Sequence, residues 1–102
     1  MTDKELLEYA AKSVGIDGFY DPLADSFRGD RRNDHGSLWW SPLECNEIAF
    51  ELLATHEFDI EITPSNIVAD CHTVSVDRTG DTAADLRRVI TMAAAAIGEA
   101  ME

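Results

Sequence analysis

Hydrophobic residues recur at helical spacing in three segments of this chain. Thr2 and Glu5 have the spacing of a capping box at the start of the first segment. Pro42 interrupts an apolar strand pattern directly before the second segment, and Asp81 or Thr82 can cap the third. The pattern therefore predicts three helices, at about 2–14, 43–55 and 82–100.

Strand patterns lie before and after the second predicted helix. Residues 37–40 form a short apolar run that includes both tryptophans of the chain, and they predict one strand. Residues 58–76 alternate in polarity around a turn and predict a hairpin. The apolar positions change parity between Cys71 and Val74. Either a bulge shifts the register there, or part of the strand is buried on both sides.

Glycine and proline divide residues 16–36 into turns, so this segment is predicted to be an irregular loop, although a short strand around Phe19 or Phe27 also fits. The whole chain, 1–102, has the length of one domain. We expect an α+β fold in which hairpin 58–76 and strand 37–40 form a small, mainly antiparallel sheet that the three helices cover. Whether the helices cover one face of the sheet or both stays open.

Acidic residues outnumber basic residues by 20 to 8, which gives a formal net charge of −12. Such a charge disfavours nucleic acid and anionic membrane as direct partners and favours a protein with a basic surface. Five carboxylates are the predicted partner-binding residues, three on one face of the second helix and two on the wet face of the hairpin: Glu44, Glu47, Glu51, Asp59 and Glu61. An acidic face also confers solubility, which is the simpler explanation.

Three of the eight basic residues lie within five positions, at Arg28, Arg31 and Arg32. Clustered guanidinium groups can hold a phosphate or a carboxylate, so this loop is a candidate binding site for a nucleotide or another small anion. Aspartates surround the cluster, so internal salt bridges are the alternative; they are Asp25, Asp30 and Asp34.

Candidate catalytic groups are few. His35 follows Asp34 and could act as a base, but no motif places a nucleophile for it, so an ordinary loop histidine is the alternative. His56 is expected at a helix end, where a cationic ring interacts favourably with terminal carbonyls. The candidate zinc ligands are Cys45, His56, Asp70, Cys71 and His72, without any paired metal-ligand spacing. We therefore predict no enzymatic activity, no metal and no cofactor.

Neither a signal sequence nor a membrane span is recognisable, so we expect a cytosolic protein with reduced thiols. Small side chains at 93–96 would let another helix approach closely, and Phe50 departs from the core face of its helix. These features predict a homodimer through the C-terminal helix, although alanine is also simply the best helix former. Arg87 and Arg88 are expected to pair with Asp85, with carboxylates of a partner chain or with solvent.

The strings WWSPL and DTAADLRRVITMAAAAIG, with the intervening helix and hairpin, resemble small phage and prophage proteins of the phage ABA (helix, sheet, helix) sandwich type. The resemblance covers about 38–98. It implies a bacteriophage origin and an accessory role in the host cytoplasm, and it provides no catalytic residues. The leading hypothesis is therefore stoichiometric binding to a host protein with a basic surface, which inhibits a bacterial defence or replication component. The alternative is a module that sequesters a nucleotide through Arg28, Arg31 and Arg32.

Overall fold

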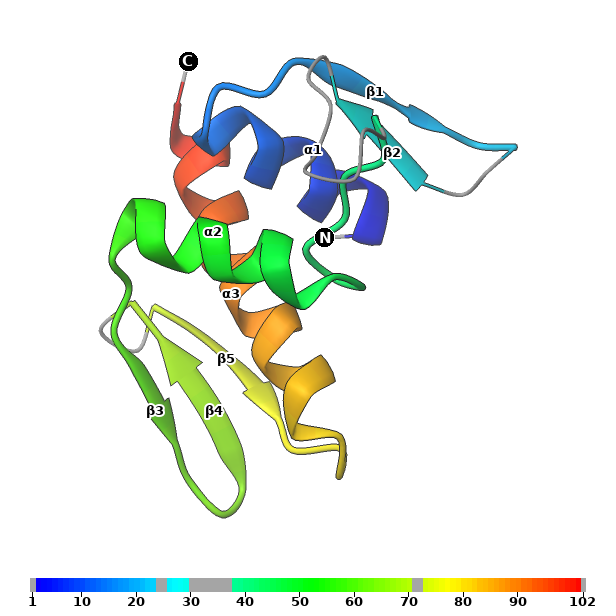
Figure 1. The fold of residues 1–102 in the computed structure, drawn as a ribbon. Helices are drawn as coiled ribbons and strands as arrows, with labels where there is room; N and C mark the ends of the chain where they lie inside the picture. The colour runs from blue at the N-terminus through cyan, green and yellow to red at the C-terminus, as the bar shows by residue number, and fades with distance from the viewer. Residues whose placement is uncertain (1, 24–25, 30–37, 71–72, 102) are drawn as a thin grey trace.

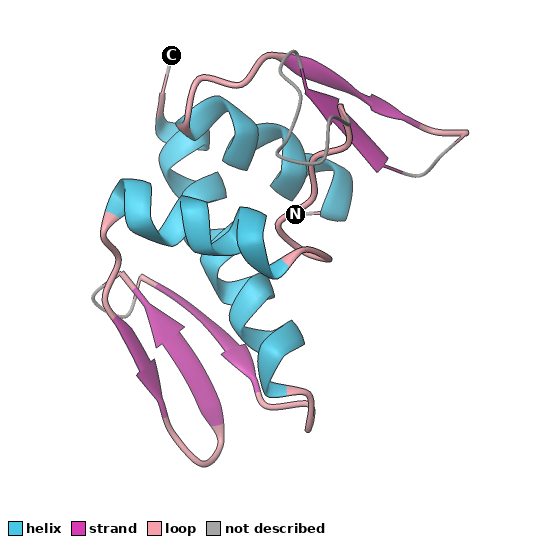
Figure 2. Cartoon of the chain, in the orientation of Figure 1, coloured by secondary structure: helices cyan, strands magenta, loops and turns pink. Residues whose placement is uncertain are grey.

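A computed structural model describes residues 2–23, 26–29, 38–70 and 73–101 (Figure 1). The helices are α1 (Asp3–Ser13), α2 (Asn46–His56) and α3 (Thr82–Ala100). The strands are β1 (Gly18–Asp21), β2 (Ser26–Gly29), β3 (Ile60–Ile62), β4 (Asn66–Ala69) and β5 (Val74–Asp77). The α+β class predicted from the sequence is confirmed. Figure 2 shows the helices in the middle of the molecule, with two antiparallel sheets at opposite ends.

The three helices begin and end near their predicted positions because local signals determine their ends. Thr2 and Glu5 form the capping box, in which the Glu5 amide donates to the Thr2 hydroxyl at 3.2 Å. Asp81 caps α3 by accepting from the amide of Ala84 at 3.1 Å. Helix α2 begins at Asn46, three residues after the predicted start, because turns occupy the residues that follow Pro42.

Helix α3 is the central element, since α1, α2, β4 and β5 all pack against it. Ala93, Ala94 and Ala95 are completely buried, and the backbone of α1 comes so close to Gly98 that a Cβ there would overlap the carbonyl group of Tyr9. The small side chains of α3 therefore serve close packing of two helices within the chain.

The segment predicted as hairpin 58–76 contains three strands in the order β3-β4-β5. The chain reverses a second time after β4, where Asp70 has a positive φ of 55° and its carbonyl accepts from the Thr73 amide at 3.0 Å. Ile67 and Ala69 face the core, and Val68, which lies between Glu61 and Ser75 on the other face, is also buried. This part of the strand is therefore buried on both sides, as one of the two alternatives expected. The change of parity in the sequence coincides with this turn, and α3 packs on one face of the sheet.

Strands β1 and β2 lie within the segment that was predicted as an irregular loop, 16–36. The structure therefore agrees with the alternative, a short strand around Phe19 or Phe27. Phe27 is buried and packs edge-on against Trp40, with ring centroids 5.8 Å apart. Trp39 forms a bridge with Arg28 of β2. The described part of the predicted strand, 38–40, therefore pairs with β2 and does not join β3, β4 and β5, and residue 37 lies outside the described residues. The pairing of this segment differs from the prediction because the local sequence does not show which distant strand a given strand pairs with.

Candidate interaction surface

The outer side of α2 carries an exposed phenylalanine between two glutamates. The inner side packs toward α3 and contains Ile48, Ala49 and Leu52. Glu47, Phe50 and Glu51 have i, i+3 and i+4 spacing, so they share the opposite side of the helix. Phe50 is 68% exposed, which confirms its predicted departure from the core face. An aromatic ring is thus presented to solvent on the same side of the helix as two carboxylates.

The other predicted partner-binding residues are also exposed. Glu44 lies in the turn before α2, and Asp59 and Glu61 lie on the polar face of the three-stranded sheet. All five predicted carboxylates are therefore accessible, three in α2 or the turn before it and two in or next to β3. We call these five carboxylates, together with Phe50, the acidic surface.

The sequence contains a stronger charge signal that hydrophobic periodicity does not reveal. Residues 33–77 include nine acidic residues and no lysine or arginine. We call 33–77 the cation-free segment. It contains α2 and the whole three-stranded sheet, and it contributes nine of the twelve net negative charges. The negative charge is therefore concentrated in one part of the chain. A count of cations along the sequence would have found it.

Basic side chains elsewhere in the described ranges have partners within the chain. Three form ion pairs, Lys4 with Glu8 at 3.9 Å, Arg28 with Asp21 at 3.3 Å and Arg88 with Asp3 at 3.0 Å. The other three donate to uncharged acceptors, Lys12 to the Met101 carbonyl, Arg78 to the Thr63 carbonyl and Thr82 hydroxyl, and Arg87 to the Leu43 carbonyl and Asn46 side chain. Arg87 and Arg88 thus bind groups of their own chain that differ from the partners expected for them.

The predicted anion site is described only at Arg28. Its guanidinium group contacts Asp21 across the β1–β2 hairpin, which agrees with internal pairing, although Asp21 was not among the aspartates expected. Arg31 and Arg32 lie outside the described residues, as do the aspartates Asp25, Asp30 and Asp34. Nucleotide binding stays a prediction, which a thermal-shift screen with cyclic and linear nucleotides tests.

A serine and a histidine meet where the ends of two helices come together. The Ser13 hydroxyl donates to the Ala10 carbonyl at 2.6 Å, and its oxygen lies 3.0 Å from Nε2 of His56. Because the hydroxyl proton is already engaged, Nε2–H is the donor between the two side chains. This is the reverse of a nucleophilic serine, whose proton must point at the base. The pair therefore joins α1 to α2 and is not arranged for catalysis.

Burial lowers the pKa of the His56 imidazole below its ordinary value, and the negative charge of Asp70 acts in the opposite direction. The ring also lies against Phe58, with centroids 5.2 Å apart. A neutral imidazole suits this environment, so the expectation of a cationic ring at the helix end was wrong. The other histidine and aspartate proposed as catalytic groups, His35 and Asp34, lie outside the described residues.

One buried carboxylate has a structural explanation. Asp85, in the first turn of α3, accepts from the Thr79 amide at 2.9 Å and from the Thr79 hydroxyl at 2.7 Å. These hydrogen bonds, with a smaller contribution from Arg78, lower the pKa of Asp85. The carboxylate therefore fixes the loop that leads from β5 into α3.

No group of three potential metal ligands is present among the residues that the structure describes. Cys45 is half-buried at the N-cap of α2, and Cys71 and His72 lie outside the described ranges. The same described ranges contain no helix with the length and hydropathy that a membrane span requires.

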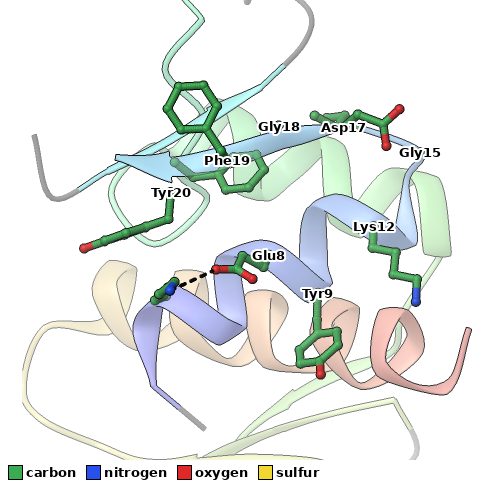
Figure 3. A pocket seen from close by; sticks show the side chains of 11 residues that line it. Glu8, Tyr9, Lys12, Gly15, Asp17, Gly18, Phe19 and Tyr20 are labelled. Atoms are coloured by element: carbon green, nitrogen blue, oxygen red, sulfur yellow. Dashed lines mark ion pairs between the residues drawn. The ribbon is translucent and has the colours of Figure 1, made fainter. Parts of the chain in front are cut away.

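A hollow of about 550 Å³ lies between α1 and β1 (Figure 3). Figure 3 shows Phe19 and Tyr20 on the strand side and Glu8, Tyr9 and Lys12 on the helix side. Its lysines are used within the chain, one in the ion pair with Glu8 and the other on the Met101 carbonyl. The hollow lies outside the cation-free segment and contains no nucleophile with an adjacent base, so it is a weaker candidate than the acidic surface.

The alanines at 93–95, which predicted a homodimer through α3, are buried by other elements of the same chain. Ala83, Arg88, Glu99 and Ala100 are exposed on this helix, and they do not form an apolar stripe. The small side chains of α3 therefore pack against the same chain and give no separate reason to expect a dimer through this helix. The homodimer stays a prediction.

Comparisons with models of known protein families, with curated proteins and with solved structures find no match to this chain. The exposed aromatic ring and the segregated negative charge therefore provide the basis for a functional conclusion.

Proposed function

We propose that this protein acts without catalysis, by stoichiometric binding of its acidic surface to a basic surface on another protein. The observation that carries this proposal is the exposure of Phe50 on the same side of α2 as Glu47 and Glu51, in a segment that contains no lysine or arginine. A few residues, often aromatic, carry most of the binding energy of an interface, and each of them contributes about 2 kcal/mol or more. Surrounding carboxylates steer a cationic partner and repel an anionic one.

The partner we propose is a host protein that uses its basic surface to bind nucleic acid. Carboxylates spaced along a helix and a strand can occupy lysine and arginine side chains that would otherwise contact phosphates. Inhibition of a bacterial defence or replication component would follow, and a phage accessory protein in the host cytoplasm is the setting that the sequence resemblance implies. Direct binding to nucleic acid or to a membrane is not part of this proposal.

Affinity capture from a bacterial lysate tests the proposal. The tagged chain should retain a basic protein at about 50 mM salt and release it at about 500 mM, because salt screens charges between exposed surfaces. Phe50→Ala, and separately the pair Glu47→Lys and Glu51→Lys, should abolish retention of that protein. The matched control is the pair Asp17→Lys and Glu99→Lys, which makes the same change of charge at exposed positions outside the cation-free segment.

Nucleic acid should compete with the chain for the captured protein, since both would occupy the same basic surface. Retention that survives both α2 variants, or that both charge-reversal pairs weaken equally, would show that the acidic surface is not the binding site. Nonspecific attraction by net charge would give the second result.

A further inference from the structure

Strand β3 lies at one edge of the three-stranded sheet, with β4 between it and β5 (Figure 1). The Asp59 carbonyl accepts from the Asp70 amide at 3.1 Å, and the Thr63 amide donates to the Asn66 carbonyl at 2.8 Å. Backbone groups alternate in direction along an antiparallel strand, so the N–H and C=O groups of Ile60 and Ile62 point away from β4. Within the described part of the chain, β4 is the partner strand of β3, and no backbone hydrogen bond from a turn or loop uses these outward groups.

One face of β3 is apolar and the other is acidic. Ile60 is half-buried and Ile62 is 52% exposed, and both lie on the face that β4 and β5 turn toward α3. Asp59 and Glu61 are exposed on the opposite face. A strand added at this edge would have apolar neighbours on one face and carboxylates on the other.

We propose that the edge of β3 binds an extended segment of the partner protein, in which apolar residues alternate with lysine or arginine. This inference rests on the proposed function and specifies its binding mode. Main-chain hydrogen bonds to Ile60 and Ile62 would provide affinity, as in other cases of strand addition. Cross-strand contacts with the isoleucines would select the apolar residues, and pairing with Asp59 and Glu61 would select the cations.

Charge argues against a second copy of this chain as the occupant. Antiparallel pairing of two β3 edges about Glu61 would place this carboxylate opposite its counterpart, and like charges directly opposite each other are destabilising. Charged residues on edge strands are a common protection against self-association. Here Asp59 and Glu61 would favour binding of a cationic strand and disfavour pairing with β3 of a second copy.

A short peptide of alternating lysine and valine is the probe, added to the full-length chain and followed by amide NMR and hydrogen exchange. Binding should protect the amides of Ile60 and Ile62. Ile62→Pro removes an outward donor without removing a hydrogen bond to β4, and it should weaken binding about tenfold, the effect of one lost hydrogen bond with its donor site blocked. Ser75→Pro is the matched control, because the register places Ser75 at the outward-facing position of the opposite edge.

Glu61→Lys is the second variant, at an exposed position where folding is not at risk. It should abolish binding of the lysine–valine peptide and allow binding of a glutamate–valine peptide. Equal binding to wild type and to Ile62→Pro, equal weakening by Ser75→Pro, or equal affinity for both peptides would overturn the inference. If neither peptide binds while the Glu47 and Glu51 variants still abolish host capture, strand addition is wrong and the proposed function stands.

Discussion

At the residue scale, the contact between α1 and α2 depends on pH, because it involves the imidazole of His56. Its side chain donates to Ser13, packs against Phe58 and is most compatible with its environment when neutral. Because burial lowers its folded-state pKa below the ordinary 6.5, the unfolded chain binds a proton more tightly than the folded chain does. Its contribution to stability is therefore fully present above pH 6.5 and is lost as the pH falls from there toward the folded-state pKa.

Urea unfolding at about pH 7.5 and about pH 5.5 measures this effect, in a range where histidine is the main titrating side chain. The wild type should lose more stability between these two values than His56→Gln does. The comparison between variants matters, since the other two histidines, His35 and His72, are present in both proteins. An identical loss of stability in the two proteins would show that the folded structure accepts the protonated imidazole of His56 as well as the neutral one.

At the element scale, the crossing of α1 and α3 depends on a single missing methyl group. A Cβ on Gly98 would overlap the Tyr9 carbonyl, and neither backbone can move without disturbing the buried alanines beside it. Alanine in place of glycine normally stabilises a helix by about 1 kcal/mol. Overpacking costs about 1–3 kcal/mol when side chains can adjust, and more is expected against backbone. We expect Gly98→Ala to lower the free energy of unfolding by about 2 kcal/mol.

Chemical denaturation of Gly98→Ala checks this value, with Glu99→Ala as the control at the next, exposed position. The control should change stability by no more than about 0.5 kcal/mol. A Gly98→Ala variant as stable as the wild type would mean that helix propensity outweighs the close approach, and that α1 has room to shift.

Elements that depend on local signals could be predicted from the sequence, and those that depend on distant partners could not. The capping box at Thr2 and the cap at Asp81 marked the starts of two helices, because each involves residues at most three positions apart. The partner of Trp39 could not be read, since a strand beside β2 and a strand beside β3 require the same apolar pattern. The turn at Asp70 was missed because no glycine or proline, the usual markers of a turn, follows it in the sequence.

The candidate surface was predictable to the same extent. Periodicity placed Phe50 and Glu51 on the outer side of α2, because a helix fixes which residues share a face. It could not show that Ile62 remains half exposed, because that depends on how far α3 extends over the sheet. The partners of Arg87 likewise come from a segment more than forty positions away, and no local spacing indicates them.

At the scale of the whole molecule, the concentration of charge predicts opposite effects of salt on stability and on binding. Nine carboxylates in 33–77 repel one another without any lysine or arginine in that segment to offset them. Screening lengths fall from about 30 Å at 0.01 M salt to about 3 Å at 1 M, so added salt should relieve this repulsion and raise the urea midpoint. The same screening should weaken capture of a basic partner, because attraction between surfaces is reduced as well.

Hydrogen exchange at low and high sodium chloride locates the effect within the chain. Amides of α2 and β4 should gain more protection with salt than amides of α1, where Lys4 already forms an ion pair with Glu8. The pair Glu47→Gln and Glu51→Gln should reduce the salt dependence of the urea midpoint, and Asp17→Asn with Glu99→Gln should reduce it less. A salt response that is uniform along the chain would mean that the net charge acts as a whole and that its concentration in one segment has no separate effect on stability.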